Sequence, residues 1–155
     1  MGEMLRKRLM SSRFESPLHE AVLNLLVAAG HVRDRMERVC TDHGITGGQF
    51  NVLRILRGAQ PQGYARCDIA KRLIERAPDV TRLIDRLARQ GLVERTTSER
   101  DQMLSVTRIT RKGLRVLDEM EPSVDETFRG LSALLTPRDA KQLSRICERL
   151  FGPGG

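Results

Sequence analysis

The sequence predicts a mainly α-helical protein that carries one small β-hairpin, an α+β fold. Apolar residues recur every three to four positions through most of the chain, which is the period of a helix with one buried face. Alternation of apolar and polar residues is confined to residues 92–109, on either side of a polar, charged stretch, and it indicates two short strands. A chain of 155 residues, 39% of them hydrophobic, can supply the core of one such domain.

The N-terminal part is expected to hold a mobile arm and one long helix. Residues 1–15 show no clear periodicity and include several basic side chains, so we interpret them as a mobile basic arm. From Pro17 to His43 the apolar positions follow helical spacing, and Gly44 provides a C-terminal stop.

Three shorter helices are expected next. Thr46 and Gln49 have the spacing of a capping box, in which each side chain satisfies a backbone N–H of the other residue, and their helix should end near Gly58. A second, short helix is predicted over residues 67–74. Pro78 suits the first turn of a third helix, because the N–H donor that proline lacks is not needed there.

A hairpin and two C-terminal helices complete the prediction. The strands are expected over residues 92–96 and 103–109. The following helix should bend near Pro122. A second capping box, formed by Thr136 and Asp139, is expected to open the last helix.

Positive charge is concentrated in one part of the chain. Lys and Arg outnumber Asp and Glu by 27 to 20 overall, and residues 66–112 alone hold 12 basic and 7 acidic side chains. Such a segment favours a polyanionic partner. With four Phe, one Tyr and no Trp, the chain offers few surfaces on which unpaired bases could stack, so duplex DNA fits better than a single strand.

The order of elements is that of a winged helix-turn-helix, in which the second helix of the motif enters the major groove. On the helix that follows Pro78, Arg82 and Arg86 could each bond a guanine edge. Thr81 could contact a base or a thymine methyl group, and Asp79 could accept a hydrogen bond from cytosine. Arginines on a helix surface are often only solvated charge, and the element order is what favours DNA contact here.

These motifs resemble the MarR (multiple-antibiotic-resistance regulator) family of bacterial repressors over nearly the whole chain. Thr46 with Gln49 resembles the opening of the family's second helix. Residues 77–87 resemble its recognition helix, residues 91–95 the start of its wing, and residues 109–113 the end of the wing.

The wing departs from the family pattern at one point. The family usually follows the wing aspartate, matched by Asp101, with two basic residues, whereas this chain has Gln102 and Met103. Arg100 is the alternative minor-groove side chain, and the resemblance implies that Asp101 organises the wing. The complete set of residues predicted to contact DNA is Pro78, Asp79, Thr81, Arg82, Arg86, Arg89, Arg95, Arg100, Asp101 and Arg108.

The resemblance implies an obligate homodimer, a winged helix-turn-helix with long N- and C-terminal dimerisation helices. We divide the chain into residues 1–45 (arm and first dimerisation helix), 46–112 (DNA-binding lobe) and 113–155 (C-terminal dimerisation helices). Two-fold symmetry predicts a pseudopalindromic operator with half-sites roughly 34 Å apart. The alternative is that the apolar stripes pack within one chain. The predicted interface residues are Leu18, Val22, Leu25, Leu143, Ile146, Leu150 and Phe151.

Other chemistries have little support in the sequence. His19, His31 and His43 are 12 residues apart, which turns each by about 120° around a helix, so they cannot share one metal ion. Cys40 and His43 share a face but supply only two ligands. We expect no metal, no cofactor and no enzyme activity, because phosphate-cradling glycine motifs, a nucleophile elbow and HExxH are all missing.

The sequence-based hypothesis is a sequence-specific double-stranded DNA-binding transcriptional regulator, a repressor that a small-molecule effector releases. The alternatives are a nonspecific architectural DNA-binding protein and a winged-helix protein-interaction module. A cytoplasmic location is expected, because the three cysteines form no disulfide framework and neither a signal peptide nor a membrane-spanning run is present. No pattern in the sequence defines the effector pocket.

Overall fold

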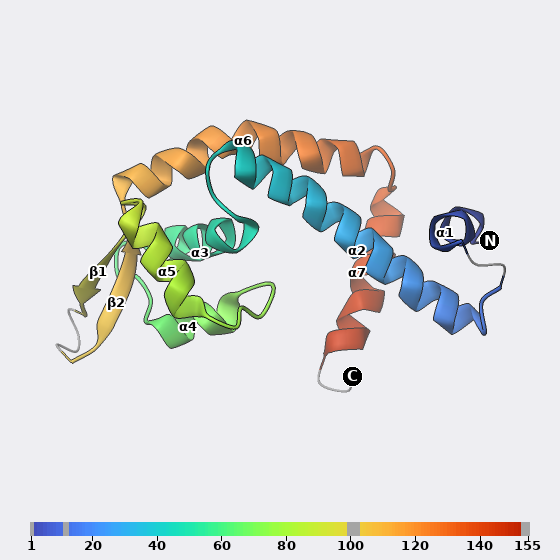
Figure 1. Ribbon diagram of the computed structural model, residues 1–155, viewed down its shortest axis with the longest axis horizontal. Coiled ribbons are helices and arrows are strands. Elements are labelled where there is room, and N and C mark those ends of the chain that lie inside the picture. The colour runs from blue at the N-terminus through green and yellow to red at the C-terminus, as the bar shows by residue number, and fades with distance from the viewer. Residues whose placement is uncertain (1, 11–12, 99–102, 153–155) are drawn as a thin grey trace.

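The computed structural model describes residues 2–10, 13–98 and 103–152, and it confirms the mainly helical fold with one hairpin (Figure 1). The strands pair antiparallel, in register from Val93 with Ile109 to Thr97 with Ser105. The elements are α1 (Glu3–Leu9), α2 (Pro17–Asp42), α3 (Gly47–Gly58), α4 (Arg66–Arg72), α5 (Val80–Arg89), β1 (Val93–Thr97), β2 (Ser105–Ile109), α6 (Arg111–Ser132) and α7 (Pro137–Phe151).

The molecule has a lobe at one end and a helical arm at the other. Helices α3, α4 and α5 and the hairpin form the lobe, and α6 arches above it (Figure 1). Pro122 lies inside α6, where a proline removes one helical hydrogen bond. Helix α2 packs against α3 and α6 and runs from the lobe to the far end, where α1 and the N-terminus lie, and α7 also lies outside the lobe.

The core of the lobe comes from helices that each bury one apolar stripe. Leu53 and Leu56 of α3 and Ile84 and Leu87 of α5 are almost completely buried. Their spacing of three residues places each pair on one side of its helix. Burying side chains of this size stabilises the fold by about 1.5–3 kcal/mol each.

The same apolar cluster also draws on the long helices. Cys40 of α2 and Leu117 and Met120 of α6 belong to it. The core therefore extends beyond residues 46–112 on both sides, and α2 is anchored in the lobe by its C-terminal turns. The division of the chain at residues 45/46 and 112/113 stays a prediction.

Both predicted capping boxes are confirmed. The Thr46 hydroxyl accepts a hydrogen bond from the Gln49 N–H, and the Thr46 N–H donates to the Gln49 side chain. Thr136 and Asp139 make the same exchange at the start of α7. The hydrogen bonds from Thr136 lower the pKa of the Asp139 carboxyl, so this cap is retained at neutral pH and weakens as the solution becomes acidic.

The expectation of a mobile N-terminal arm is wrong for the residues that the structure describes. Residues Glu3–Leu9 form α1, and Leu5 is only 3% exposed. The Arg6 guanidinium lies 5.7 Å from the centre of the Phe14 ring, which in turn meets the His19 ring edge-on at 6.3 Å. A seven-residue helix with one buried leucine is too short to produce a visible period in the sequence.

The expected position of Pro78 in a helix is also wrong. Helix α5 begins at Val80, because Asp79 is the N-cap residue and its carboxylate accepts a hydrogen bond from the Arg82 N–H at 2.9 Å. Pro78 precedes the cap and lies outside the helix. Side-chain capping by Asp79 decided the boundary here, rather than the preference of proline for a first helical turn.

Helix α4 is shorter than predicted. It ends at Arg72, and Leu73 has an extended backbone. Ile74, the last residue of the predicted helix, is 84% exposed, and its N–H donates to Oδ1 of Asn51 at 2.8 Å. The Asn51 side chain of α3 thus accepts the hydrogen bond of a backbone N–H that lies just beyond the end of α4.

A backbone bridge joins the middle of β2 to the loop before α4. The Tyr64 N–H donates to the Thr107 carbonyl at 3.1 Å, and the Thr107 N–H donates to the Tyr64 carbonyl at 2.8 Å. Gly63 has a φ of 75°, and a Cβ there would overlap the Thr107 carbonyl oxygen. Only glycine meets both conditions, so Gly63 allows this close approach.

Candidate nucleic-acid interface

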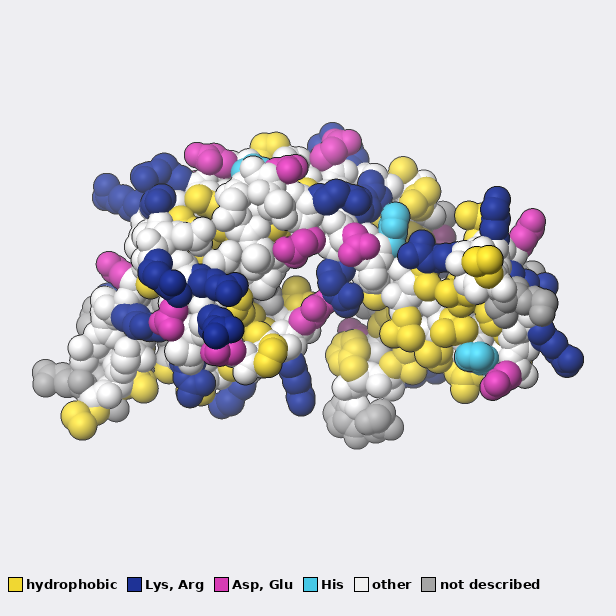
Figure 2. Space-filling model, in the orientation of Figure 1, with side chains coloured by type: hydrophobic (Ala, Val, Ile, Leu, Met, Phe, Trp, Pro, Cys, Tyr) yellow, Lys and Arg dark blue, Asp and Glu magenta, His cyan; other side chains and the backbone are white. Residues whose placement is uncertain are grey.

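Helix α5 presents one polar, basic face to solvent. Val80, Ile84 and Leu87 are buried on its other side, and this fixes the rotation of the helix in the lobe. Figure 2 shows Lys and Arg side chains gathered over α4 and α5, with acidic side chains between them. The exposed positions of α5 include Thr81, Arg82, Arg86 and Arg89.

The two arginines predicted to bond guanine differ in their surroundings. The Arg86 side chain makes no hydrogen bond or ion pair with any residue of the described ranges. The Arg82 Nε lies 3.8 Å from Oδ2 of Asp79, in an exposed pair that water screens. Since Oδ1 of Asp79 caps the helix, the first role of Asp79 in the free protein is to start α5 and orient Arg82.

An ion pair joins the recognition helix to the wing. Arg95 of β1 donates to Oδ1 of Asp85 on α5, and Arg89 Nε donates to the Asp85 carbonyl at 3.4 Å. Arg95 and Arg89, both predicted to contact DNA, therefore have partners within the lobe.

Arg108 lies at the inner side of the wing, and its side chain is partly buried. Its Nε donates to the Gln62 carbonyl at 3.2 Å, in the loop before α4. This contact ties β2 to that loop, beside the Tyr64–Thr107 bridge. Arg100 and Asp101 lie outside the described residues, and their assignment to the wing contacts stays a prediction.

Sequence reasoning missed the basic residues on and around α4. Arg66, Lys71 and Arg76 are exposed next to the recognition helix. Arg72 is held by Asp68 at 3.7 Å, and its guanidinium lies 4.2 Å from the centre of the Tyr64 ring. The first helix of such a motif crosses the DNA backbone, so a count of basic residues on α4 would have added these side chains to the predicted DNA contacts.

The residues predicted to form the dimer interface lie on α2 and α7, away from the lobe. No residue of α7 is buried within the single chain, although one side of the helix is apolar. Leu18 on α2 is 71% exposed and Phe151 on α7 is 77% exposed. Figure 2 shows apolar side chains gathered at this end of the molecule. The other predicted positions, all at least partly exposed, are Val22, Leu25, Leu143, Ile146 and Leu150.

The cysteines and histidines form no cluster that suggests a metal site. Among the described residues, no three His, Cys, Asp or Glu side chains are placed to hold one ion. Nδ1 of His43 lies 2.8 Å from the Val39 carbonyl, which engages the ring within α2. No described helix is both long enough and apolar enough to cross a bilayer.

The two lobe cysteines should differ strongly in reactivity. Cys40 is fully buried, and burial together with the Glu37 charge raises the pKa of its thiol to about 11, whereas Cys67 is exposed. We expect a disulfide reagent such as DTNB to label Cys67 of the native protein rapidly and Cys40 only on unfolding. A Cys67→Ser variant should lose a rapid phase that Cys40→Ser retains, and rapid labelling of Cys40 would contradict this assignment.

The order of the helices, the polar and basic face of α5 and the adjoining hairpin define a winged helix-turn-helix DNA-binding protein. The MarR family model matches residues 45–102. A MarR transcription factor from Planctomyces limnophilus is 34% identical; the match covers 88% of this chain and 98% of that chain, with a TM-score of 0.67. The chain therefore belongs to the MarR family of transcriptional regulators.

Two further proteins are similar over most of their length. The homoprotocatechuate degradative operon repressor of Escherichia coli is 24% identical over 138 residues, which cover 88% of this chain and 92% of that protein. The S. aureus MepR structure, a DNA complex, is 21% identical with a TM-score of 0.72 and covers 81% of this chain and 92% of that chain. At 21% identity, the similarity to MepR shows a common fold and no more.

Proposed function

We propose that this chain is a homodimeric, sequence-specific repressor that places helix α5 of each copy in successive major grooves of a pseudopalindromic operator. The observation that carries the proposal is the face of α5, where Thr81, Arg82 and Arg86 are exposed while the opposite face is held in the core. The pairing of Asp85 with Arg95 supports a fixed wing beside the helix. The MepR complex is a solved example of this fold on DNA.

The proposal of a homodimer rests on the apolar faces of α2 and α7. A 15-residue helix that buries none of its residues within its own chain gains too little from its intrinsic propensity to be stable in water. A second copy of the same surface would cover it, as two-fold symmetry requires. We assign Leu18, Val22 and Leu25 of α2, with the apolar positions of α7, to this contact.

We further propose that a small aromatic acid releases the operator. The similar E. coli protein is named for repressing the degradation of homoprotocatechuate, which is an aromatic acid. Such an effector must bind the DNA-free dimer more tightly than the DNA-bound one, because only differential affinity shifts the equilibrium. Homoprotocatechuate is the first probe, and its addition should lower operator affinity of the purified dimer.

The test is binding of the purified protein to the genomic fragment upstream of its own gene, at several salt concentrations and with random competitor DNA. A footprint with two-fold symmetry that survives the competitor is the expected result. If random competitor DNA removes the protein from this fragment as readily as from any other DNA, the result would favour an architectural DNA-binding protein. Absence of salt-dependent binding would favour a protein-interaction module.

A further inference from the structure

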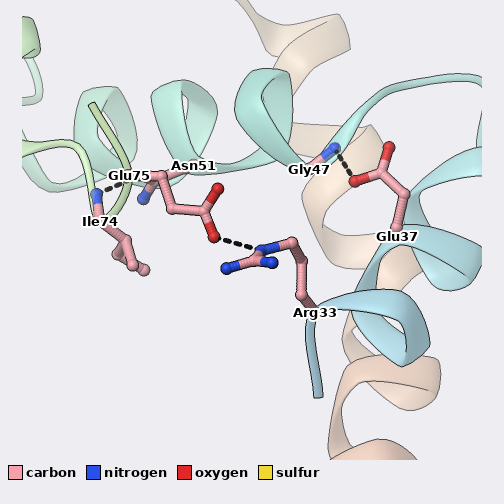
Figure 3. Close-up of polar contacts among 6 residues, drawn as sticks. All are labelled: Arg33, Glu37, Gly47, Asn51, Ile74 and Glu75. Atoms are coloured by element: carbon pink, nitrogen blue, oxygen red, sulfur yellow. Dashed lines mark hydrogen bonds and ion pairs between the residues drawn. The ribbon is translucent and has the colours of Figure 1, made fainter. Parts of the chain in front are cut away.

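The long helix α2 connects the dimer end of the molecule to the lobe. Its N-terminal half carries the predicted dimer residues, and its C-terminal turns supply Val39 and Cys40 to the core of the lobe. Helix α2 joins the lobe through its packing on α3 and α6, and it also meets the loop between α4 and α5. Two polar contacts cross that junction (Figure 3).

The first contact joins α2 to the start of α3. Oε2 of Glu37 accepts a hydrogen bond from the Gly47 N–H at 2.8 Å. The Gly47 N–H belongs to the first turn of α3, where backbone donors lack a partner within the helix and the helix dipole favours negative charge. The capping box covers other donors of this turn, so α3 is capped once by its own residues and once by α2.

The second contact joins α2 to the loop that leads into the recognition helix. The Nε of Arg33 donates to Oε1 of Glu75, which follows Ile74 in that loop. Arg33 and Glu37 are four residues apart and so lie on the same side of α2. The loop is also fixed to α3, because Asn51 accepts the Ile74 N–H. The loop before α5 is thus held from both sides.

We propose that Arg33 and Glu37 are positioning residues for operator recognition, which hold the lobe on α2 and thereby set the separation of the two α5 helices in the dimer. This inference rests on the proposed function. The Arg33 and Glu75 side chains are 56% and 61% exposed, so the ion pair contributes little to overall stability. A restraint of this size is sufficient to favour one of several similar orientations of the lobe on α2, although it adds little to the free energy of unfolding.

Neighbouring glycines offer a matched pair of variants. A Cβ at Gly47 would collide with Oε2 of Glu37, whereas a Cβ at Gly48 makes only ordinary contacts, with the two Leu83 methyl groups at 3.4 and 3.6 Å and the Thr46 hydroxyl at 3.9 Å. Gly47→Ala should displace the Glu37 carboxylate, which is the free end of a long side chain, and leave α3 folded. Gly48→Ala adds the same methyl group one residue away and leaves both contacts intact.

The experiment measures affinity for the operator and for operators whose half-sites are one base pair closer or farther apart. One base pair moves a half-site by about 3.4 Å and turns it by roughly 35° around the duplex. Gly47→Ala and Arg33→Gln should each reduce the preference for the natural spacing by roughly two- to fivefold, as expected for a weak polar restraint. Gly48→Ala should keep the wild-type preference for the natural spacing. The double variant Arg33→Glu with Glu75→Arg, which reverses both charges and rebuilds the ion pair, should recover the preference that Arg33→Gln loses.

The outcomes separate this inference from the proposed function. An equal loss of affinity at every spacing would show that the contacts serve stability alone and would overturn the positioning role. Unchanged spacing preference in Gly47→Ala and Arg33→Gln would overturn it as well, with the repressor assignment intact. If the wild-type protein does not discriminate the operator from random DNA, the proposed function fails and the positioning role falls with it.

Discussion

Replacing Arg86 by alanine should weaken binding to the cognate operator by about 1–3 kcal/mol, a factor of roughly 5 to 150, and weaken binding to random DNA much less. Arg86 is exposed on α5 and has no partner among the described residues, so its guanidinium is available for a base edge. Arg82→Ala should act in the same direction. Nε of Arg82 lies 3.8 Å from Oδ2 of Asp79 in an exposed ion pair that water screens, so this pair competes only weakly with a DNA contact of Arg82.

The control is Arg138→Ala, which removes the same charge at the exposed start of α7, remote from the lobe. It should leave the ratio of operator to random affinity unchanged. Titrations of each variant at several salt concentrations separate the two roles of an arginine. Equal losses on both DNAs, with the slope of log affinity against log salt reduced by about 1, would make Arg86 a phosphate contact instead.

The parts of the fold that sequence predicted well are those fixed by near neighbours. The exchange between Thr46 and Gln49 depends on residues three apart, and so does the one between Thr136 and Asp139. The stripe of α5 depends on the helical period, which also predicted its exposed face. These features need no knowledge of which elements pack together, and they placed Arg82 and Arg86 on the solvent side.

The parts that could not be predicted depend on contacts between distant segments. The ion pair of Arg33 with Glu75 joins residues 42 apart, and the bond of Asn51 to Ile74 joins residues 23 apart. A charged side chain on a helix surface has many possible partners, and only the packing of α2 on α3 selects one. Helix α1 was missed for another reason, because seven residues with one buried leucine show no helical period.

An Ile146→Asp variant should convert the dimer into monomers at micromolar concentration. Ile146 lies in the apolar stripe of α7, between Leu143 and Leu150, and all three are exposed in the single chain. An unpaired carboxylate buried at such a contact costs about 3–5 kcal/mol, so the dissociation constant of the dimer should rise by roughly two to four orders of magnitude. Sedimentation equilibrium of the purified proteins measures this change.

The matched control is Lys141→Asp, which introduces the same side chain on the polar face of α7 and should leave the dimer intact. Operator binding gives a second readout, because a monomer presents one α5 helix and loses the contribution of the other half-site. The Ile146→Asp protein should therefore bind the full operator about as weakly as an isolated half-site. If it remains dimeric with wild-type operator affinity, the apolar face of α7 is not the dimer interface, and the assignment of α2 and α7 to a two-fold contact is wrong.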